Sequence, residues 1–165
     1  MKPVYNSLLI LYETGIRHSE LNRESLVILP DQTIKVISKK KSENRIIDPL
    51  TLSDKCLNLL YSFTNNDVIL SRSVLYDYFL RSCYPYRIVK SGNQVVLHSF
   101  RYNFIKKLYT LYNDYVIVQS IIGHKDLSHT IMYINSTLQV LPVIYLPAFL
   151  VGQLDLIQST VITFD

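Results

Sequence analysis

The chain has 165 residues, of which 48% are hydrophobic and 18% charged, a composition that excludes an intrinsically disordered protein and predicts one globular domain. Two cysteines, Cys56 and Cys83, exclude a disulfide framework and a cysteine-rich metal centre. The formal net charge of +4 fits a polyanionic partner such as nucleic acid without requiring one. No apolar signal region follows Met1, so we expect an intracellular protein, cytoplasmic or on the host nucleoid.

The first third of the chain predicts two helical segments and a β-hairpin. Residues 7–12 are apolar and compatible with a helix, which Gly15 would end. Residues 19–25 predict a second, short helix. Residues 33–37 alternate polar and apolar side chains, as a half-buried strand does, and residues 45–47 predict another strand. The two strands enclose a lysine-rich turn and form a hairpin with a basic tip.

The rest of the chain predicts helices. Apolar side chains recur there at the three- and four-residue spacing of a helical face. This pattern predicts five helices, over residues 53–63, 73–82, 99–111, 116–122 and 127–134. A loop at residues 91–93 separates the second of them from the third. The sequence therefore predicts an α+β fold that is mainly α, with a small antiparallel sheet near the N-terminus.

Residues 127–154 are nearly uncharged and long enough to cross a membrane as a helix. Pro142 and Pro147 interrupt this stretch, along with several amide side chains. Its flanks also lack a basic cluster, since Lys125 is its only close basic neighbour and Asp155 follows it. We therefore expect no contact with a membrane.

Three short motifs follow one another along the chain. The first covers residues 14–21 (Thr-Gly-Ile-Arg-His-Ser-Glu-Leu) and contains Arg17 and Glu20. The second is the His-x-x-Arg of residues 98–101. The third covers residues 122–133, where a Gly-His pair precedes a tyrosine by nine positions, counted from the histidine. Any one of these motifs is weak evidence, whereas the three in this order and at these spacings are specific.

Together the motifs resemble the signature boxes of the tyrosine recombinase (phage integrase) family, over about residues 8–134. The resemblance implies the catalytic-domain fold of that family. It also implies site-specific cleavage and rejoining of double-stranded DNA through a 3′-phosphotyrosine intermediate, as in DNA integration and recombination. It implies a homo-oligomer on the DNA, and neither a metal ion, nor ATP, nor another cofactor.

The resemblance assigns Tyr133 as the nucleophile and Arg17 and Arg101 as the phosphate-binding arginines. A phenol is a poor nucleophile at neutral pH because its ordinary pKa is about 10. Nearby cations favour the phenolate. Two guanidinium groups also suit the phosphate, since each can bind two of its oxygens at once. The resemblance further assigns His98 to proton transfer at the tyrosine and His124 to a hydrogen bond with the phosphate.

The basic hairpin occupies the position where the family has its catalytic lysine, the acid for the 5′-hydroxyl leaving group. Counting back from Pro49, which resembles the proline after the second strand, favours Lys41. A slip of one or two residues in the turn would select Lys40 or Lys39 instead. Lys39, Lys40 and Arg45 are expected to contact DNA.

The chain departs from the family pattern in two places. Tyr102 stands where the family usually has a second histidine, immediately after the second arginine. Only about a dozen residues precede Thr14, whereas the family normally has a separate helical core-binding domain there. We therefore expect residues 1–165 to form a single catalytic domain without that domain. Residues 135–165 are expected to form a C-terminal tail that docks in cis or on a neighbouring protomer.

Three alternatives remain open from the sequence. A type IB topoisomerase would use similar chemistry, and relaxation of supercoils without a specific site would favour it. A recombinase remnant would bind DNA without forming a covalent adduct. An unrelated helical interaction protein would match the motifs by chance. The filled catalytic positions favour an active recombinase.

Overall fold

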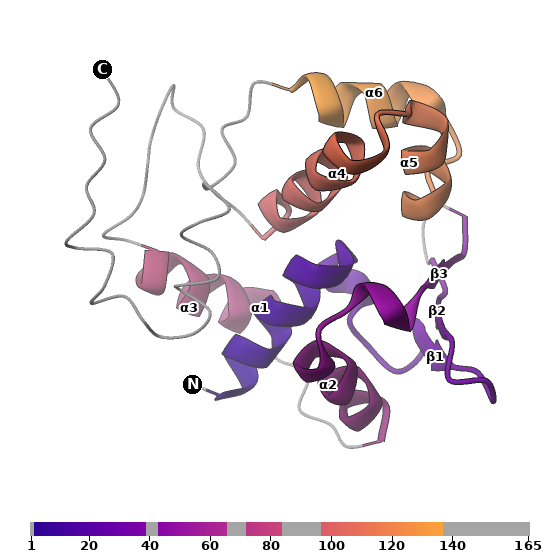
Figure 1. Ribbon diagram of the computed structural model, residues 1–165. Helices are drawn as coiled ribbons and strands as arrows, with labels where there is room; N and C mark the ends of the chain where they lie inside the picture. Colours follow the sequence, from indigo (N-terminus) through magenta and orange to yellow (C-terminus); the bar gives the residue numbers. More distant parts are fainter. Residues whose placement is uncertain (1, 39–42, 66–71, 84–96, 137–165) are drawn as a thin grey trace.

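The computed structural model describes residues 2–38, 43–65, 72–83 and 97–136 (Figure 1). The predicted fold class is confirmed, because helices dominate these ranges and a small antiparallel sheet lies near the N-terminus. The helices are α1 (Lys2–Thr14), α2 (Asp54–Asn65), α3 (Arg72–Cys83), α4 (Ser99–Tyr112), α5 (Tyr115–Ile122) and α6 (Leu127–Asn135). The strands are β1 (Leu26–Ile28), β2 (Ile34–Val36) and β3 (Arg45–Ile47), and short 3-10 helices cover η1 (His18–Glu20) and η2 (Pro49–Thr51).

The sheet has the strand order β1-β2-β3, and both strand pairs are antiparallel. It contains the two strands of the predicted hairpin and, as a third, β1. In the register, Val36 pairs with Leu26 on one side and with Arg45 on the other. Because successive side chains of a strand point to opposite faces, Arg45 and Ile47 share one face and are buried, whereas Ile46 is exposed.

The helix predicted over residues 19–25 is wrong in its extent. Only the single turn of η1 forms, and the chain then turns around Asn22. The Asn22 side-chain oxygen accepts hydrogen bonds from the backbone N–H groups of Glu24 and Ser25, at 3.1 and 3.0 Å. An asparagine that binds backbone groups in this way competes with helix formation.

The main core forms around α1, which lies next to α4 in the middle of the fold (Figure 1). Leu8 and Ile10 of α1 and Phe100 of α4 belong to this core. The helix ends at Gly15, whose φ of +59° is a conformation that only glycine adopts without strain. A Cβ atom at Gly15 would also collide with the ring of Phe104 on α4. The glycine therefore lets the first motif approach α4 closely.

A second, smaller core joins α4, α5 and α6. Ile105, Val118 and Tyr133 belong to it, one from each helix. Gly123 ends α5 with a φ of +71°, and a Cβ atom there would lie 2.8 Å from the backbone oxygen of Glu43. The Glu43 N–H donates a hydrogen bond to the Gly123 oxygen at 3.0 Å. The glycine of the third motif therefore contacts the chain just before β3.

The predicted boundaries of α5 and α6 have clear local causes. Asp114 caps α5 by accepting hydrogen bonds from the backbone N–H groups of Val116 and Ile117. Asp126 caps α6 in the same way through the N–H of Ser128. Aspartate is among the preferred residues at this position because its carboxylate satisfies the free N–H groups of the first turn.

Within the ranges given above, no helix is both long and apolar enough to cross a membrane. Residues 137–165, most of the stretch expected to form a docking tail, lie outside the described residues. The loop predicted at residues 91–93 lies outside them as well.

Candidate active site

Arg17 lies just after α1 and is held by Glu20, one turn further on. Its Nη1 atom donates to Glu20 Oε1 at 2.7 Å, and its backbone N–H donates to Oε2 at 2.8 Å. The Glu20 side chain is buried, which opposes its ionisation, but the Arg17 backbone N–H and the positive charges of Arg45 and Arg17 outweigh that effect. The pKa of Glu20 is therefore below its ordinary value, and the carboxylate is charged at neutral pH.

Arg101 connects the first motif to the third. It lies on α4 and is almost fully buried. Its Nη1 atom donates to the Gly15 oxygen at 2.8 Å, and its Nη2 atom donates to the Ile122 oxygen at 3.2 Å. These carbonyl groups lie at the ends of α1 and α5, where helix dipoles favour a cation. In the part of the chain that the structure describes, the buried Nε atom has no hydrogen-bond partner.

Burial, followed by the charges of Arg45 and Arg17, lowers the pKa of Arg101 to about 9. Arg101 is therefore still protonated at neutral pH. A buried arginine that keeps its charge and has an unused N–H group can donate that group to an anion entering the site.

Arg45 does not lie at the protein surface, where its place in a basic hairpin predicts it. A residue of the basic hairpin is expected to contact DNA, but Arg45 is buried on the inner face of the sheet, with an exposed fraction of 7%. Its Nη1 atom donates to the Thr14 oxygen at 3.2 Å, and its Nη2 atom lies 4.0 Å from Glu20 Oε2. This burial contradicts a contact at the protein surface. The alternation of the strand is the physical reason, since Arg45 shares its face with Ile47.

The side chains of His98, just before α4, and Tyr133, on α6, are in contact. His98 Nε2 lies 2.5 Å from the Tyr133 hydroxyl oxygen, a short hydrogen bond. The Tyr133 ring also packs on Tyr102, with ring centroids 4.3 Å apart. Tyr133 is 9% exposed, so these neighbours define the position of its hydroxyl group.

His124 is buried and also contacts the Tyr133 ring, with ring centroids 5.3 Å apart. Its Nδ1 atom lies 2.9 Å from the hydroxyl oxygen of Thr130 on α6. Burial, and then the positive charges of Arg101 and Arg17, lower the pKa of His124 to about 3. The imidazole is therefore neutral at physiological pH. With Nδ1 bound to Thr130, only Nε2 can serve an incoming ligand.

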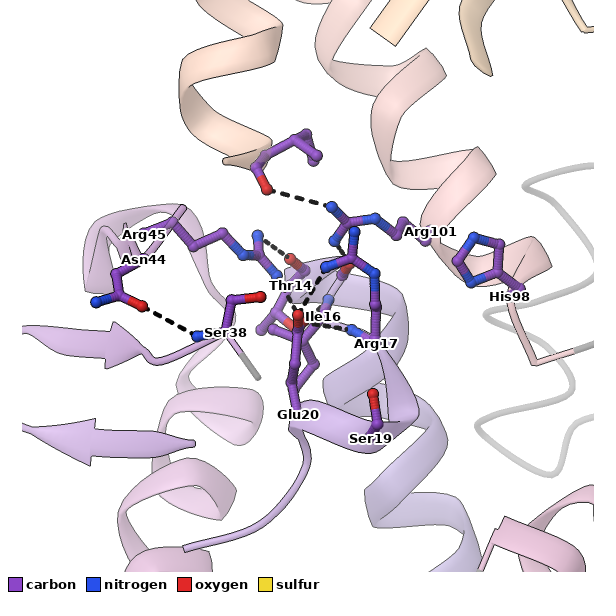
Figure 2. A network of polar contacts seen from close by, with 12 residues as sticks. Thr14, Ile16, Arg17, Ser19, Glu20, Ser38, Asn44, Arg45, His98 and Arg101 are labelled. Atoms are coloured by element: carbon purple, nitrogen blue, oxygen red, sulfur yellow. Dashed lines mark hydrogen bonds and ion pairs between the residues drawn. The ribbon is translucent and has the colours of Figure 1, made fainter. Parts of the chain in front are cut away.

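Five of the six residues assigned from the resemblance thus lie around one place in the fold. The arginines of the first and second motifs approach each other above Glu20, and His98 lies beside Arg101 (Figure 2). The sixth residue, Lys41, lies outside the described residues together with Lys39 and Lys40. No group of three or more His, Cys, Asp or Glu side chains that would bind a metal ion is found in the described ranges.

Three residues of the site make contacts that the sequence did not predict. Thr130 binds His124, Tyr102 packs on Tyr133, and Arg45 approaches Glu20. The sequence did indicate that Thr130 faces the site, because it precedes Tyr133 by three positions and residues three apart on a helix share a face. The inward direction of the Arg45 side chain depends on the register of β3, which the sequence does not indicate directly.

The fold combines helices packed on α1 with a small antiparallel sheet at one edge (Figure 1), and it brings two arginines, two histidines and a tyrosine together. This combination is the one that defines the catalytic-domain class of the tyrosine recombinases. The chain belongs to the phage integrase family, whose model matches residues 3–139. The comparison with curated proteins finds no match.

Similar solved structures agree with this fold. The XerA recombinase aligns with a TM-score of 0.56 and 20% identity, over 87% of this chain and 61% of its own. XerH recombinase bound to difH substrate, in the pre-cleavage complex, aligns with a TM-score of 0.54 and 22% identity, over 82% and 44%. The Tn1549 transposon integrase in complex with transposon right end DNA aligns with a TM-score of 0.55 and 16% identity, over 91% and 58%. The chain thus spans between about two fifths and three fifths of these proteins.

Proposed function

We propose that this chain is a catalytic domain that cleaves and rejoins double-stranded DNA at a specific site, as in DNA integration or recombination. The observation that carries the proposal is the grouping of the arginine and histidine side chains around Tyr133. His98 binds the Tyr133 hydroxyl group, His124 packs on its ring, and the positive charges of Arg101 and Arg17 act on His124. Family membership and the solved recombinases and integrases that share the fold support the same function. This activity would take place inside the cell, in the cytoplasm or on the host nucleoid.

In the proposed reaction the Tyr133 oxygen attacks the phosphorus and the bond to the 5′ oxygen breaks. His98 Nε2, at 2.5 Å, accepts the phenolic proton. Arg17 and Arg101 bind the non-bridging oxygens and stabilise the charge that develops on them. We propose that His124 Nδ1 accepts a hydrogen bond from the Thr130 hydroxyl group, 2.9 Å away. The neutral imidazole then carries its proton on Nε2 and donates it to a phosphate oxygen.

The leaving 5′ oxygen needs a proton, for which we propose Lys41. Lys40 and Lys39 are the alternatives and otherwise contact the DNA backbone as simple cations. The product is a 3′-phosphotyrosine and a free 5′-hydroxyl. Attack by a 5′-hydroxyl on this intermediate reverses every step, so the bond energy is conserved without ATP.

We further propose that the chain works as a homo-oligomer on DNA. Exposed apolar side chains on α4, α5 and α6 support this, among them Leu111, Val116 and Met132. The uncharged residues 137–154 would provide the matching segment, either from the same protomer or from its neighbour. Apolar patches of this kind are typical of protein interfaces.

A covalent trapping assay tests the function and does not require an identified DNA site. A library of nicked duplexes with a randomised core releases a short fragment after cleavage, so the phosphotyrosine adduct cannot be reversed. At low salt, where phosphate contacts are strongest, we expect a slower protein band on a denaturing gel. The band should be absent for Tyr133→Phe. The absence of an adduct in spite of DNA binding would contradict the proposal and favour the remnant.

A second assay separates recombinase from topoisomerase activity. Supercoiled plasmid that lacks the sequences enriched in trapped library members should stay supercoiled. Efficient relaxation of that plasmid, dependent on Tyr133, would favour a type IB topoisomerase instead.

A further inference from the structure

Arg45 has an arrangement that neither DNA contact nor the reaction steps above explain. It is a fully cationic side chain on a strand whose neighbouring inward residues are apolar. Its Nη1 atom binds the Thr14 oxygen, and its Nη2 atom makes no hydrogen bond within the described residues. Burying a charge is costly unless a partner compensates it. The partner here is Glu20, 4.0 Å away.

Glu20 is thereby placed between two arginines. Arg17 takes one carboxylate oxygen with Nη1 and the other with its backbone N–H. Arg45 approaches the second oxygen, Oε2, from the sheet. Arg17 and Glu20 belong to the same turn, whereas Arg45 comes from β3, and Figure 2 shows the guanidinium groups of Arg17 and Arg45 meeting at Glu20.

The two arginines that contact Glu20 differ in how firmly their side chains are held. Arg45 is held between β3, the end of α1 and Glu20, and it is buried. Arg17 is partly exposed, with a side-chain exposed fraction of 19%, and its positive charge acts on Arg101 and His124. The third guanidinium, Arg101, adds positive charge nearby but makes its hydrogen bonds to Gly15 and Ile122.

We propose that Arg45 is a positioning residue for Arg17 that acts through Glu20. The positive charge of Arg45 keeps the Glu20 carboxylate ionised and turned toward Arg17. The Arg17 guanidinium group is thereby held in place before DNA binds. The inference rests on the proposed function, in which Arg17 binds the scissile phosphate. A fixed donor is the more effective one, because it needs no reorganisation in the transition state.

The test compares Arg45→Met with Arg45→Lys, and uses Arg23→Met as the matched control at an exposed position. Mobility of the Arg17 side chain is measured by the ¹H–¹⁵N heteronuclear NOE of its Nε–H group, without DNA. Arg45→Met should lower this NOE while that of Arg101 stays high. Arg45→Lys keeps the positive charge but loses the planar guanidinium group. The NOE of Arg17 should therefore lie between those of the wild type and Arg45→Met. Arg23→Met should change neither.

The same variants are then compared in single-turnover adduct formation at saturating library DNA. Arg45→Met should lower the rate by about 10–100-fold, the cost of a small misplacement of a reacting group. The Kd for DNA and its salt dependence should stay as in the wild type. A residue that contacts phosphate would behave in the opposite way, with weaker binding and a salt slope reduced by about 1.

Glu20→Gln provides a second line of evidence that does not require stable Arg45→Met. If Arg45 acts through Glu20, the double variant Glu20→Gln/Arg45→Met should form adduct no more slowly than Glu20→Gln alone. Where Arg45→Met folds, the double variant should unfold at a higher temperature than it does, because Glu20→Gln removes the buried negative charge that Arg45→Met leaves with fewer compensating cations. Additive losses of rate in the double variant would overturn the proposal.

Two failures remain distinguishable. Unchanged Arg17 mobility in a folded Arg45→Met protein overturns the positioning role, even if the wild type forms adduct. A wild type that forms no adduct contradicts the proposed function. The NOE of Arg17 still decides whether Arg45 orders that side chain.

Discussion

His124 lies in a buried and positively charged environment. Its pKa falls to about 3 because of burial and the nearby arginines, whereas the unfolded chain has the ordinary value of about 6.5. Below that value the unfolded state binds more protons than the folded state, so folding stability falls as the pH drops from about 6.5 toward 3.

We therefore predict that His124 does not titrate between pH 8 and pH 5. The Cε1–H chemical shift of His124 in the folded protein should stay constant over this range. The free energy of unfolding should also decrease less on acidification for His124→Gln than for the wild type. A His124 midpoint near pH 6.5 would contradict the buried, neutral imidazole.

Thr130 should be needed to orient His124. Thr130→Val keeps the shape of the side chain but removes the hydroxyl that lies 2.9 Å from Nδ1. We expect the adduct rate to fall by about 10-fold, as for a weakened donor to a developing charge, with DNA affinity unchanged. Ser128→Ala on the exposed face of α6 is the control and should have the wild-type rate. A wild-type adduct rate for Thr130→Val would contradict a role for Thr130 in orienting His124.

Tyr102 should act through its ring and not through its hydroxyl group. The ring packs on Tyr133 and is edge-on to His98, with centroids 5.8 Å apart. Tyr102→Phe should therefore keep the adduct rate. Tyr102→Ala should lower it by about two- to tenfold, since an aromatic pair contributes about 0.5–1.5 kcal/mol. Equal losses in both variants, measured in the trapping assay, would show that the hydroxyl group matters instead.

At the scale of elements, Gly123 sets how α5 meets the strand β3. An alanine there would need a positive φ and would bring its Cβ within 2.8 Å of the Glu43 oxygen. Gly123→Ala should lower the free energy of unfolding by at least about 1–2 kcal/mol, the cost of this conformation for a residue with a side chain. Asn113, which has a φ of +49° after α4, is the matched control.

Asn113→Gly should be neutral or slightly stabilising, because glycine adopts that conformation without strain. Denaturant unfolding of both variants measures the difference. Equal effects of Gly123→Ala and Asn113→Gly would mean that the close approach to Glu43 does not constrain α5.

The helices were predictable because their signals are local. In α5 and α6, Asp114 and Asp126 cap the starts and Gly123 marks an end, so each boundary follows from a few neighbouring residues. The side-chain direction in β3 was not predictable to the same degree. Its three residues offer apolar side chains on both faces, and the tertiary register decides that Arg45 points inward and Ile46 outward. A charged residue in a basic hairpin is for this reason expected at the surface from sequence alone.

At the scale of the whole molecule, the site joins three distant motifs through backbone carbonyl groups. The sequence spacing predicted which residues would meet, since the order of the boxes matches a known family. It could not predict the packing of Tyr102 on Tyr133, because that contact depends on how α4 and α6 cross. The contact of His124 with Thr130 depends on how the chain turns between α5 and α6. The family pattern therefore located the site, and the fold supplied its supporting residues.

Removal of the C-terminal stretch tests the proposed assembly. A chain that ends at Ser136 keeps α6 and every described site residue. We expect it to lose self-association on DNA in sedimentation velocity, and to expose α4–α6 apolar side chains to a hydrophobic dye. Unchanged assembly and solubility would contradict a docking role for residues 137–165.

The proposed function requires that Tyr133 becomes covalently bound to DNA. The chain has 13 tyrosines, so the most direct measurement is mass spectrometry of the trapped adduct after digestion with trypsin and nuclease. Cleavage after Lys125 leaves one peptide that contains Tyr133 and Tyr145, and fragment ions separate the two. We predict a nucleotide remnant on Tyr133 alone, lost in Tyr133→Phe. A remnant on any other tyrosine, or an adduct that persists in Tyr133→Phe, would contradict the assignment of the active site.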